Sequence, residues 1–529
     1  MTEVLRQLRD LARATLVLQR RGMVDVFNPI QTVRASQALR RYGSFGGLAT
    51  HTAARYADAP AFTDDDGTLS FRELEDESNA LARGLGECGV GGGVIGLLVR
   101  NHRCLLLALF AAGKLGVRVV LLNTGFAAPQ LADVCRRENV STIIADQEYS
   151  GLLDVLPPEV DRIVGWSGAG LASVTIGRSA APLPPPARAG GMVLLTSGTT
   201  GTPKGAPRGK VNPLQSAQLL DRIPWPAGGA YCVAAPMFHA TGLATCALGL
   251  ALGNRIVVAR RFDPEAALAT IERYDVRALI VVPTMLTRIL DLGPEVLARY
   301  DTTSLDVIFA AGSALPPELC RRTAETFGDV LYNLYGSTEV AVAAVATPSE
   351  LRAAPGTVGR PPLGCSLAAY DDKRRKITEP GRVGTLFVSS GLSFTGYTDG
   401  GQKESVDGLL CSGDTGHFDG NGLWFVDGRD DEMIVSGGEN VFPLEVENLL
   451  AGHPAVDDVA VVGVDDCDFG QRLRAFIVGV PGASLAADDI RTYVRTHLAR
   501  HKVPRDVIFV DVLPRNETGK LLKAELPRD

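Results

Sequence analysis

The chain lacks several features that would assign it to a compartment or to a class of partner. Its nine cysteines are an odd number and include no Cys-x-x-Cys pair, so we expect reduced thiols rather than a disulfide framework. Charged residues interrupt residues 1–21 before an apolar core develops, which argues against a secretory signal peptide. The net charge is −7, so no nucleic acid is expected as a partner. These absences predict a cytoplasmic protein.

Motifs of other enzyme classes are also missing. Lys204 follows Pro203 and precedes Gly205, whereas a phosphate-loop NTPase needs Gly-Lys followed directly by Ser or Thr. The glycines at 91–96 match a dinucleotide fingerprint, but they precede their strand instead of following it. The sequence has no motif of a Ser/His/Asp triad. One uncharged run, residues 231–254, is long enough to cross a bilayer, but its proline, histidine and glycines favour a buried loop and helix.

What is present is the alternation of strands and helices typical of an α/β protein. Apolar residues make up 46% of the chain and charged residues 21%, near the average of soluble proteins. Strands are predicted at 92–99, 117–123, 140–145, 255–259, 278–282 and 305–310, and helices at 104–115, 129–138 and 264–274. Past residue 428 shorter elements follow, with strands at 456–464, 473–480 and 506–512 and a helix at 488–500.

These elements predict an α/β fold in three parts. We expect a basic helical arm at 1–45, a large N-terminal domain of α/β layers with a β-rich subdomain at 46–429, and a small α+β domain at 430–529. The arm carries eight arginines against three acidic residues up to residue 41. Two interpretations stay open: peripheral contact with an anionic membrane, or a solvated helix that caps the main domain. The absence of tryptophan from the arm favours the cap.

The most informative segment is Leu-Leu-Thr-Ser-Gly-Thr-Thr-Gly-Thr-Pro-Lys-Gly at 194–205. Glycines let backbone N–H groups approach phosphate oxygens, hydroxyls add donors, and the lysine adds a positive charge, so the loop suits a triphosphate. A tight turn at 311–314 also ends a predicted parallel strand, where ligands of open α/β sheets gather. The residues expected to hold ATP in these two segments are Thr196, Ser197, Gly198, Thr199, Thr200, Gly201, Lys204, Gly312, Ser313 and Ala314.

The loop at 194–205 closely resembles the signature of the acyl-adenylate-forming (AMP-binding) superfamily, which includes acyl-CoA synthetases, aryl-CoA ligases, luciferases and peptide-synthetase adenylation domains. Further motifs follow in that family's order over nearly the whole chain after the arm. Tyr335-Gly-Ser-Thr-Glu339 resembles the second nucleotide motif. The resemblance implies that Tyr335 stacks on adenine beside Gly336, that Thr338 reaches the α-phosphate, and that Glu339 holds Mg²⁺, which prefers carboxylate oxygen.

Two further segments extend the resemblance. Asp414, in a Ser-Gly-Asp sequence, and Arg429 are similar to the family's ribose-binding pair. The next stretch looks like the hinge and thiol-tunnel segment. It implies that Asp431 is the hinge residue of a mobile C-terminal domain, and that Gly437 and Gly438 admit the pantetheine arm of CoA.

Residues 514–521 resemble the catalytic-lysine motif. The resemblance implies that Lys520 neutralises charge shared by the carboxylate and the α-phosphate. A carboxylate has a poor leaving group, so the family converts the acid and ATP to acyl-AMP and pyrophosphate, and a thiol then displaces AMP. Positioning and charge stabilisation supply the catalysis without a side-chain nucleophile. The catalytic residues expected are Lys520, Glu339, His239 and Thr338.

The predicted substrate is an acid without an amino group. His239, in Pro-Met-Phe-His, resembles the family's acid-site motif, beside the carboxylate or gating its pocket. Amino-acid-activating relatives place an aspartate in this vicinity, and residues 236–253 contain none. The small and apolar residues at 240–252 suit a channel for an alkyl tail. The arm looks like those of bacterial long-chain fatty-acyl-CoA synthetases, which favours a medium- or long-chain fatty acid.

The sequence therefore predicts an acyl-CoA synthetase that uses ATP, Mg²⁺ and coenzyme A. The alternatives are a fatty-acyl-AMP ligase, an aryl-acid CoA ligase, and a non-catalytic lipid or nucleotide sensor on the same fold. The presence of both Lys204 and Lys520 argues against the sensor. A monomer and a homodimer are both compatible with the sequence.

Overall fold

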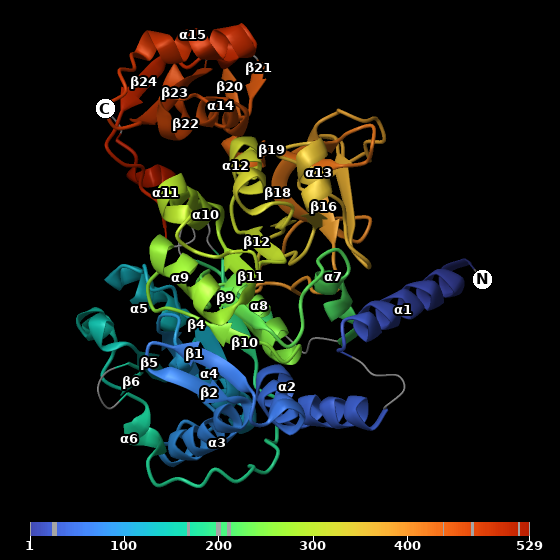
Figure 1. The fold of residues 1–529 in the computed structure, drawn as a ribbon, viewed down its shortest axis with the longest axis vertical. Helices are drawn as coiled ribbons and strands as arrows, with labels where there is room; N and C mark the ends of the chain where they lie inside the picture. Colours follow the sequence, from blue (N-terminus) through green and yellow to red (C-terminus); the bar gives the residue numbers. More distant parts are fainter. Residues whose placement is uncertain are drawn as a thin grey trace. The chain divides into compact units, whose positions relative to one another are not determined.

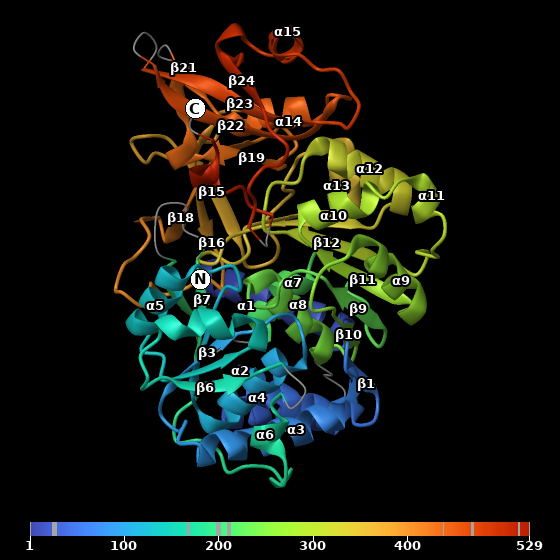
Figure 2. The same cartoon turned by 90° about the vertical axis from the view of Figure 1, so that its left-hand side faces the viewer.

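The computed structural model of the chain describes residues 2–23, 29–166, 170–196, 203–208, 213–436, 439–466, 470–516 and 519–527. Two units pack within themselves: residues 1–310 with 391–402, and residues 311–390 with 403–529. Figures 1 and 2 show their helices and strands. The predicted α/β class is confirmed. The predicted boundaries at residues 45 and 429 stay a prediction.

One sheet of the first unit carries both ends of the segment at 194–205 that is predicted to bind the triphosphate (the phosphate loop). Its central strands are buried on both faces, which explains why they are continuous apolar runs in the sequence. All neighbouring strands are parallel except β7 (Met192–Leu195) and β8 (Gly205–Arg208). Helices α4 (Arg103–Leu115) and α5 (Ala128–Arg137) connect strands of this sheet. The order is β6 (Asp161–Val164), β5 (Thr142–Ala145), β3 (Val94–Leu98), β4 (Arg118–Leu121), β7 (Met192–Leu195) and β8 (Gly205–Arg208).

The segment that contains His239 follows a strand of the second sheet in the first unit. The uncharged run predicted as a buried loop and helix also includes a strand, β9, and its helix is α8 (Ala240–Ala251). Helix α9 (Pro264–Tyr274) begins as predicted, because the Asp263 side chain accepts the N–H of Ala266. The strands within this unit are β12 (Val307–Ala311), β11 (Val276–Val281), β9 (Ala230–Val233), β10 (Arg255–Val257), β1 (Pro60–Asp64) and β2 (Gly67–Ser70), in that order.

The basic arm is helical, with a break in helical geometry at Gly43 (φ +74°, ψ −173°). Helix α1 (Thr2–Arg20) contacts α7 (Ala217–Leu220), and α2 (Pro29–Tyr56) packs against α3 (Phe71–Glu87) and α4. Within the described part of the chain, no helix combines the length and the apolar character needed to span a membrane. The packing of α2 supports the arm as a cap, and membrane contact stays a prediction.

The second unit contains β-rich structure, which follows helix α12 (Pro317–Phe327). Strand β13 (Leu331–Tyr335) pairs antiparallel with β14 (Ala344–Ala346). A five-stranded sheet follows, whose core side chains include Ala369, Leu386 and Trp424. Its strands are β15 (Ser366–Tyr370), β16 (Gly384–Ser389), β18 (Leu409–Phe418) and β17 (Ser405–Val406), with β19 (Trp424–Arg429) paired to β18.

The C-terminal part of this unit is the expected small α+β fold. Strand β23 (Gly470–Gly479) runs antiparallel to β22 (Val456–Asp466) and parallel to β24 (Asp506–Phe509). The predicted strands and helix are present, although the last strand ends at Phe509 and the helix at His497. The elements are β20 (Ile434–Ser436), β21 (Glu439–Val441), α14 (Pro443–Ala451), β22 (Val456–Asp466), β23 (Gly470–Gly479), α15 (Ala487–His497) and β24 (Asp506–Phe509).

Candidate functional site

The ends of the phosphate loop are fastened to each other. The N–H of Thr196 donates to the carbonyl of Lys204 at 2.9 Å, and the N–H of Lys204 donates to the Thr196 hydroxyl at 3.3 Å. The Lys204 ammonium lies 5.1 Å from the centre of the Tyr397 ring. The loop residues predicted between them, Ser197, Gly198, Thr199, Thr200 and Gly201, lie outside the described residues.

The predicted turn at 312–314 follows β12 directly. Gly312 has φ of +104°, a conformation that favours glycine. Gly312 and Ala314 are exposed and Ser313 is half-buried. The turn is therefore partly exposed at the carboxyl end of a parallel strand, and its contact with ATP stays a prediction.

The second nucleotide motif folds into a compact loop after β13. The Ser337 hydroxyl donates to the Glu339 carboxylate at 2.9 Å and accepts the N–H of Glu339 at 3.2 Å. The N–H of Ala341 donates to the carbonyl of Ser337 at 2.9 Å. A Cβ at Gly336 would lie 1.9 Å from the carbonyl oxygen of Ala341, so only glycine fits there. The loop fixes the position of Glu339, which is 9% exposed. The preceding residue, Thr338, is half-buried.

One carboxylate suits the way proteins hold Mg²⁺ on a triphosphate. Within the described residues, no three His, Cys, Asp or Glu side chains group as a metal site. Mg²⁺ keeps several waters and takes its other ligands from one or two carboxylates and the phosphates. Glu339 at the second nucleotide motif therefore fits the ion as a single protein ligand.

Asp414 is the centre of a buried cluster in the second unit. The hydroxyl of Tyr335 donates to its Oδ2 at 2.5 Å, and Arg429 donates to its Oδ1 at 3.3 Å. Strand pairing aligns Asp414 with Arg429 across β18 and β19. Burial raises the pKa of Asp414, while Tyr335, Arg429 and Lys403 oppose that rise. The structure thus brings together the predicted adenine-stacking residue and the predicted ribose pair.

The hinge and tunnel segment is described in part. Asp431 lies in a short 3₁₀ helix, Asp430–Glu432, directly after β19. The position suits a hinge, because it joins the sheet to the C-terminal α+β fold. Gly437 and Gly438 lie outside the described residues.

Lys520 lies on a tight loop that the C-terminal fold holds in place. Its N–H donates to the Asn516 side chain at 2.9 Å, and its carbonyl accepts the N–H of Asn516 at 2.9 Å. Arg515 forms two hydrogen bonds with the Asp458 carboxylate, at 3.0 and 2.7 Å, and a third with the Gly519 carbonyl at 2.8 Å. Asp458 belongs to the long strand β22. Arg515 therefore ties the lysine loop to a rigid strand.

His239 occupies the N-cap position of α8, where its side chain makes no capping hydrogen bond. Its Nε2 is buried without a hydrogen-bond partner, and its ring lies 4.5 Å from that of Phe238. Burial lowers the pKa of His239 to about 4, so the ring is neutral near pH 7. Asn101, which the sequence did not indicate, accepts the N–H of Met237 at 2.7 Å and donates to the carbonyl of Ala235 at 3.0 Å. It fixes the turn that presents His239.

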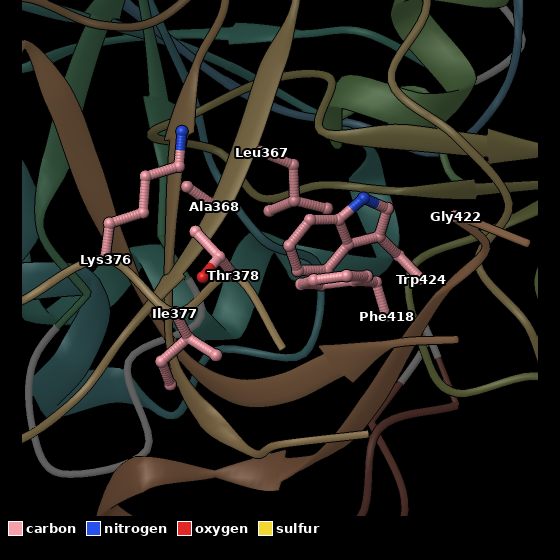
Figure 3. A pocket seen from close by; sticks show the side chains of 8 residues that line it. All are labelled: Leu367, Ala368, Lys376, Ile377, Thr378, Phe418, Gly422 and Trp424. Atoms are coloured by element: carbon pink, nitrogen blue, oxygen red, sulfur yellow. The ribbon is translucent and has the colours of Figure 1, made fainter. Parts of the chain in front are cut away.

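A pocket of about 290 Å³ in the second unit is a separate feature (Figure 3). The rings of Phe418 and Trp424 form one wall, with centroids 5.2 Å apart. None of the residues predicted from the sequence lines it. The lining residues are Leu367, Ala368, Lys376, Ile377, Thr378, Phe418, Gly422 and Trp424.

Comparison with known proteins identifies the family. The model of the AMP-binding enzymes matches residues 49–398, and that of the AMP-binding enzyme C-terminal domain matches residues 445–520. The fatty acid–[acyl-carrier-protein] ligase ScoC of Streptomyces coeruleorubidus is 29% identical, over 88% of this chain and 92% of its own. The 2-succinylbenzoate–CoA ligase of Geobacillus kaustophilus is 32% identical, over 88% and 94%.

Solved structures agree with this assignment. The anthranilate CoA ligase AuaEII, in complex with anthranoyl-AMP, has a TM-score of 0.83 and 25% identity, over 93% of this chain and 98% of its own. The chain belongs to the AMP-binding enzyme family. It is an ATP-dependent acid–CoA ligase that works through an acyl-adenylate, and the family uses ATP, Mg²⁺ and CoA.

Proposed function

We propose that the protein activates a carboxylic acid with an uncharged, apolar tail and transfers the acyl group to CoA. The observation that carries the choice of acid is the neutral environment of His239. Its Nε2 is sealed without a partner and its pKa is about 4, and residues 231–254 contain no charged side chain. A substrate ammonium or second carboxylate would have no opposite charge from this segment.

In the first half-reaction a carboxylate oxygen attacks the α-phosphorus of ATP and pyrophosphate leaves. Lys204 and the other residues of the phosphate loop hold the β- and γ-phosphates, and Thr338 reaches the α-phosphate. Lys520 neutralises the negative charge that develops between the carboxylate and the α-phosphate. Glu339 would hold Mg²⁺, which would neutralise charge on the triphosphate. Tyr335 and Asp414 orient the nucleoside.

In the second half-reaction the CoA thiol attacks the acyl carbon of acyl-AMP. AMP leaves with the carboxylate oxygen that had joined the phosphorus, and the thiol loses its proton. Asp431 acts as the hinge between the two steps, and Gly437 with Gly438 forms the passage for the thiol arm.

Fatty acids are our first candidates for the acid, and aryl acids are the second. The apolar helix α8 and the likeness to a fatty acid ligase support an alkyl tail. The likeness to a 2-succinylbenzoate ligase and an anthranilate ligase supports an aryl acid. The same fatty acid relative is named for a carrier protein, so the acceptor needs a test of its own.

The test is acid-dependent pyrophosphate release with ATP and Mg²⁺, using straight-chain acids of graded length and common aryl acids. We expect release with one apolar series and CoA-dependent AMP release with the same acid. Lys520→Ala should abolish pyrophosphate release, whereas Lys373→Ala, on an exposed side chain, should not. Release of pyrophosphate with no response to CoA would assign an acyl-AMP ligase instead. No release with any acid would contradict the proposal.

A further inference from the structure

Residues 391–402 pack with the first unit although the chain on both sides of them belongs to the second. Tyr397 in this segment meets the phosphate loop, because the Lys204 ammonium lies 5.1 Å from the centre of its ring. That distance is within the range of cation–π attraction. Within the described residues the structure gives Lys204 no ion pair with a carboxylate. Among the described residues, the tyrosine ring is thus a contact of the ammonium that does not neutralise its charge.

The Tyr397 ring is itself braced. Phe394, which is buried, meets it edge-on with centroids 4.8 Å apart at 72°. The N–H of Tyr397 donates to the carbonyl of Gly401 at 2.9 Å, and its carbonyl accepts the N–H of Gly400 at 3.1 Å. A ring held on one face and at both ends of its backbone offers a fixed surface to the ammonium.

The segment is also fastened to the exit of the phosphate loop. The N–H of Thr398 donates to the carbonyl of Gly205 at 2.9 Å, and its hydroxyl donates to Oε1 of Glu138 at 2.6 Å. Glu138 is fully buried, and Arg137 donates to the same oxygen at 3.2 Å. A Cβ at Gly205 would lie 2.5 Å from both Oε1 of Glu138 and the Thr398 hydroxyl. The tyrosine and the lysine thus share one anchored base.

We propose that Tyr397 is a positioning residue that holds the Lys204 side chain ready for the β- and γ-phosphates of ATP. A carboxylate partner would bind the ammonium more strongly, but it would neutralise the charge and compete with the phosphates. An aromatic ring attracts the ammonium and leaves its charge intact. It also reduces the conformational entropy that the long side chain loses when the nucleotide binds. The inference rests on the proposed role of Lys204 in ATP binding.

The test measures two affinities by calorimetry: that for the Mg²⁺ complex of α,β-methylene-ATP and that for AMP. Tyr397→Leu removes the ring, and Tyr397→Phe keeps it. We expect Tyr397→Leu to weaken the triphosphate analogue about three- to fivefold, in line with cation–π attraction at partly exposed sites. AMP affinity should not change, because AMP has no β- or γ-phosphate. Tyr397→Phe should bind both ligands nearly as well as the natural chain.

Two further variants sharpen the comparison. Tyr274→Leu is a control that removes a tyrosine ring of α9, which Arg255 and Arg273 contact. It should leave both affinities unchanged. In a Lys204→Ala background, Tyr397→Leu should have no further effect, because the partner of the ring is gone. Equal weakening of AMP and the analogue, equal damage by Phe and Leu, or an additive double variant would each overturn the proposal. Intact binding without pyrophosphate release would instead refute the proposed function and leave this inference standing.

Discussion

Removing the hydroxyl of Tyr335 should make ATP use more sensitive to acid. Tyr335→Phe deletes the 2.5 Å hydrogen bond to Oδ2 of Asp414 and keeps the ring for adenine. Burial raises the pKa of Asp414, and the Tyr335 hydrogen bond is the strongest of the interactions that oppose the rise. Without it the pKa moves further up. Protonated Asp414 loses acceptor capacity, so ribose binding fails as the pH falls.

The magnitude follows from the burial of the pair. A hydrogen bond to a charged group contributes about 1.5–3 kcal/mol, and the Asp414 side chain is 13% exposed, so water replaces little of it. This energy corresponds to about a 10- to 100-fold shift of the protonation equilibrium. Arg429 remains at 3.3 Å from Oδ1, which keeps the effect toward the lower value.

The assay is acid-dependent pyrophosphate release from pH 5 to 9 at subsaturating Mg²⁺-ATP, which reports kcat/KM for ATP and the titration of the free enzyme. We expect the acidic limb of the Tyr335→Phe profile to move to higher pH, with a smaller loss at alkaline pH. Tyr370→Phe is the matched control, because Tyr370 donates to Asp407 at 2.8 Å in the same unit and lies outside the site. Superimposable limbs for Tyr335→Phe and the natural chain would refute the reasoning.

Three other variants test separate parts of the site. His239→Ala should lower kcat/KM for the acid and leave the KM for ATP near its original value. Because the pKa of His239 is about 4, the variant and the natural enzyme should have the same steady-state pH profile between pH 6 and 8; a titration in that range that His239→Ala removes would contradict this. Gly336→Ala places a Cβ 1.9 Å from a carbonyl oxygen, so thermal denaturation should show a loss of about 1–3 kcal/mol together with weaker pyrophosphate release; unchanged stability would count against the tight loop. Arg515→Ala should slow pyrophosphate release about tenfold by loosening the Lys520 loop, with a smaller effect on thioester formation from supplied acyl-AMP. Since Arg515 and Asp458 are about one-third exposed, we expect little loss of stability. Equal loss of both half-reactions would contradict this.

Much of the fold could be predicted because its signals are local. Asp263 before Pro264 marks the start of a helix through capping chemistry, and the structure confirms it. Buried parallel strands are continuous apolar runs for the same reason. The ends of elements were less well predicted. The last strand stops at Phe509. The backbone of α2 leaves helical geometry at Gly43 (φ +74°), and a second helical stretch follows up to Tyr56, since packing against neighbouring helices decides where a helix ends.

The residues of the candidate site could likewise be predicted only where they belong to contiguous motifs. Contiguous motifs pointed to Tyr335 and Asp414, and the structure joins the two by a hydrogen bond. No sequence pattern indicated Asn101 or the contact between Thr398 and Glu138, two residues that lie 260 positions apart. A single polar residue carries no pattern of its own, and only the folded chain reveals its partner. The roles of the site residues in catalysis stay predictions.

The central claim is that the acid is activated as an acyl-adenylate. The direct measurement is a turnover with the best acid labelled by ¹⁸O in its carboxylate, with AMP and pyrophosphate examined by mass spectrometry. We expect one labelled oxygen in AMP, because the carboxylate attacks the α-phosphorus and that oxygen leaves with AMP when the thiol attacks. Label in pyrophosphate, unlabelled AMP, or ADP as the product would contradict it.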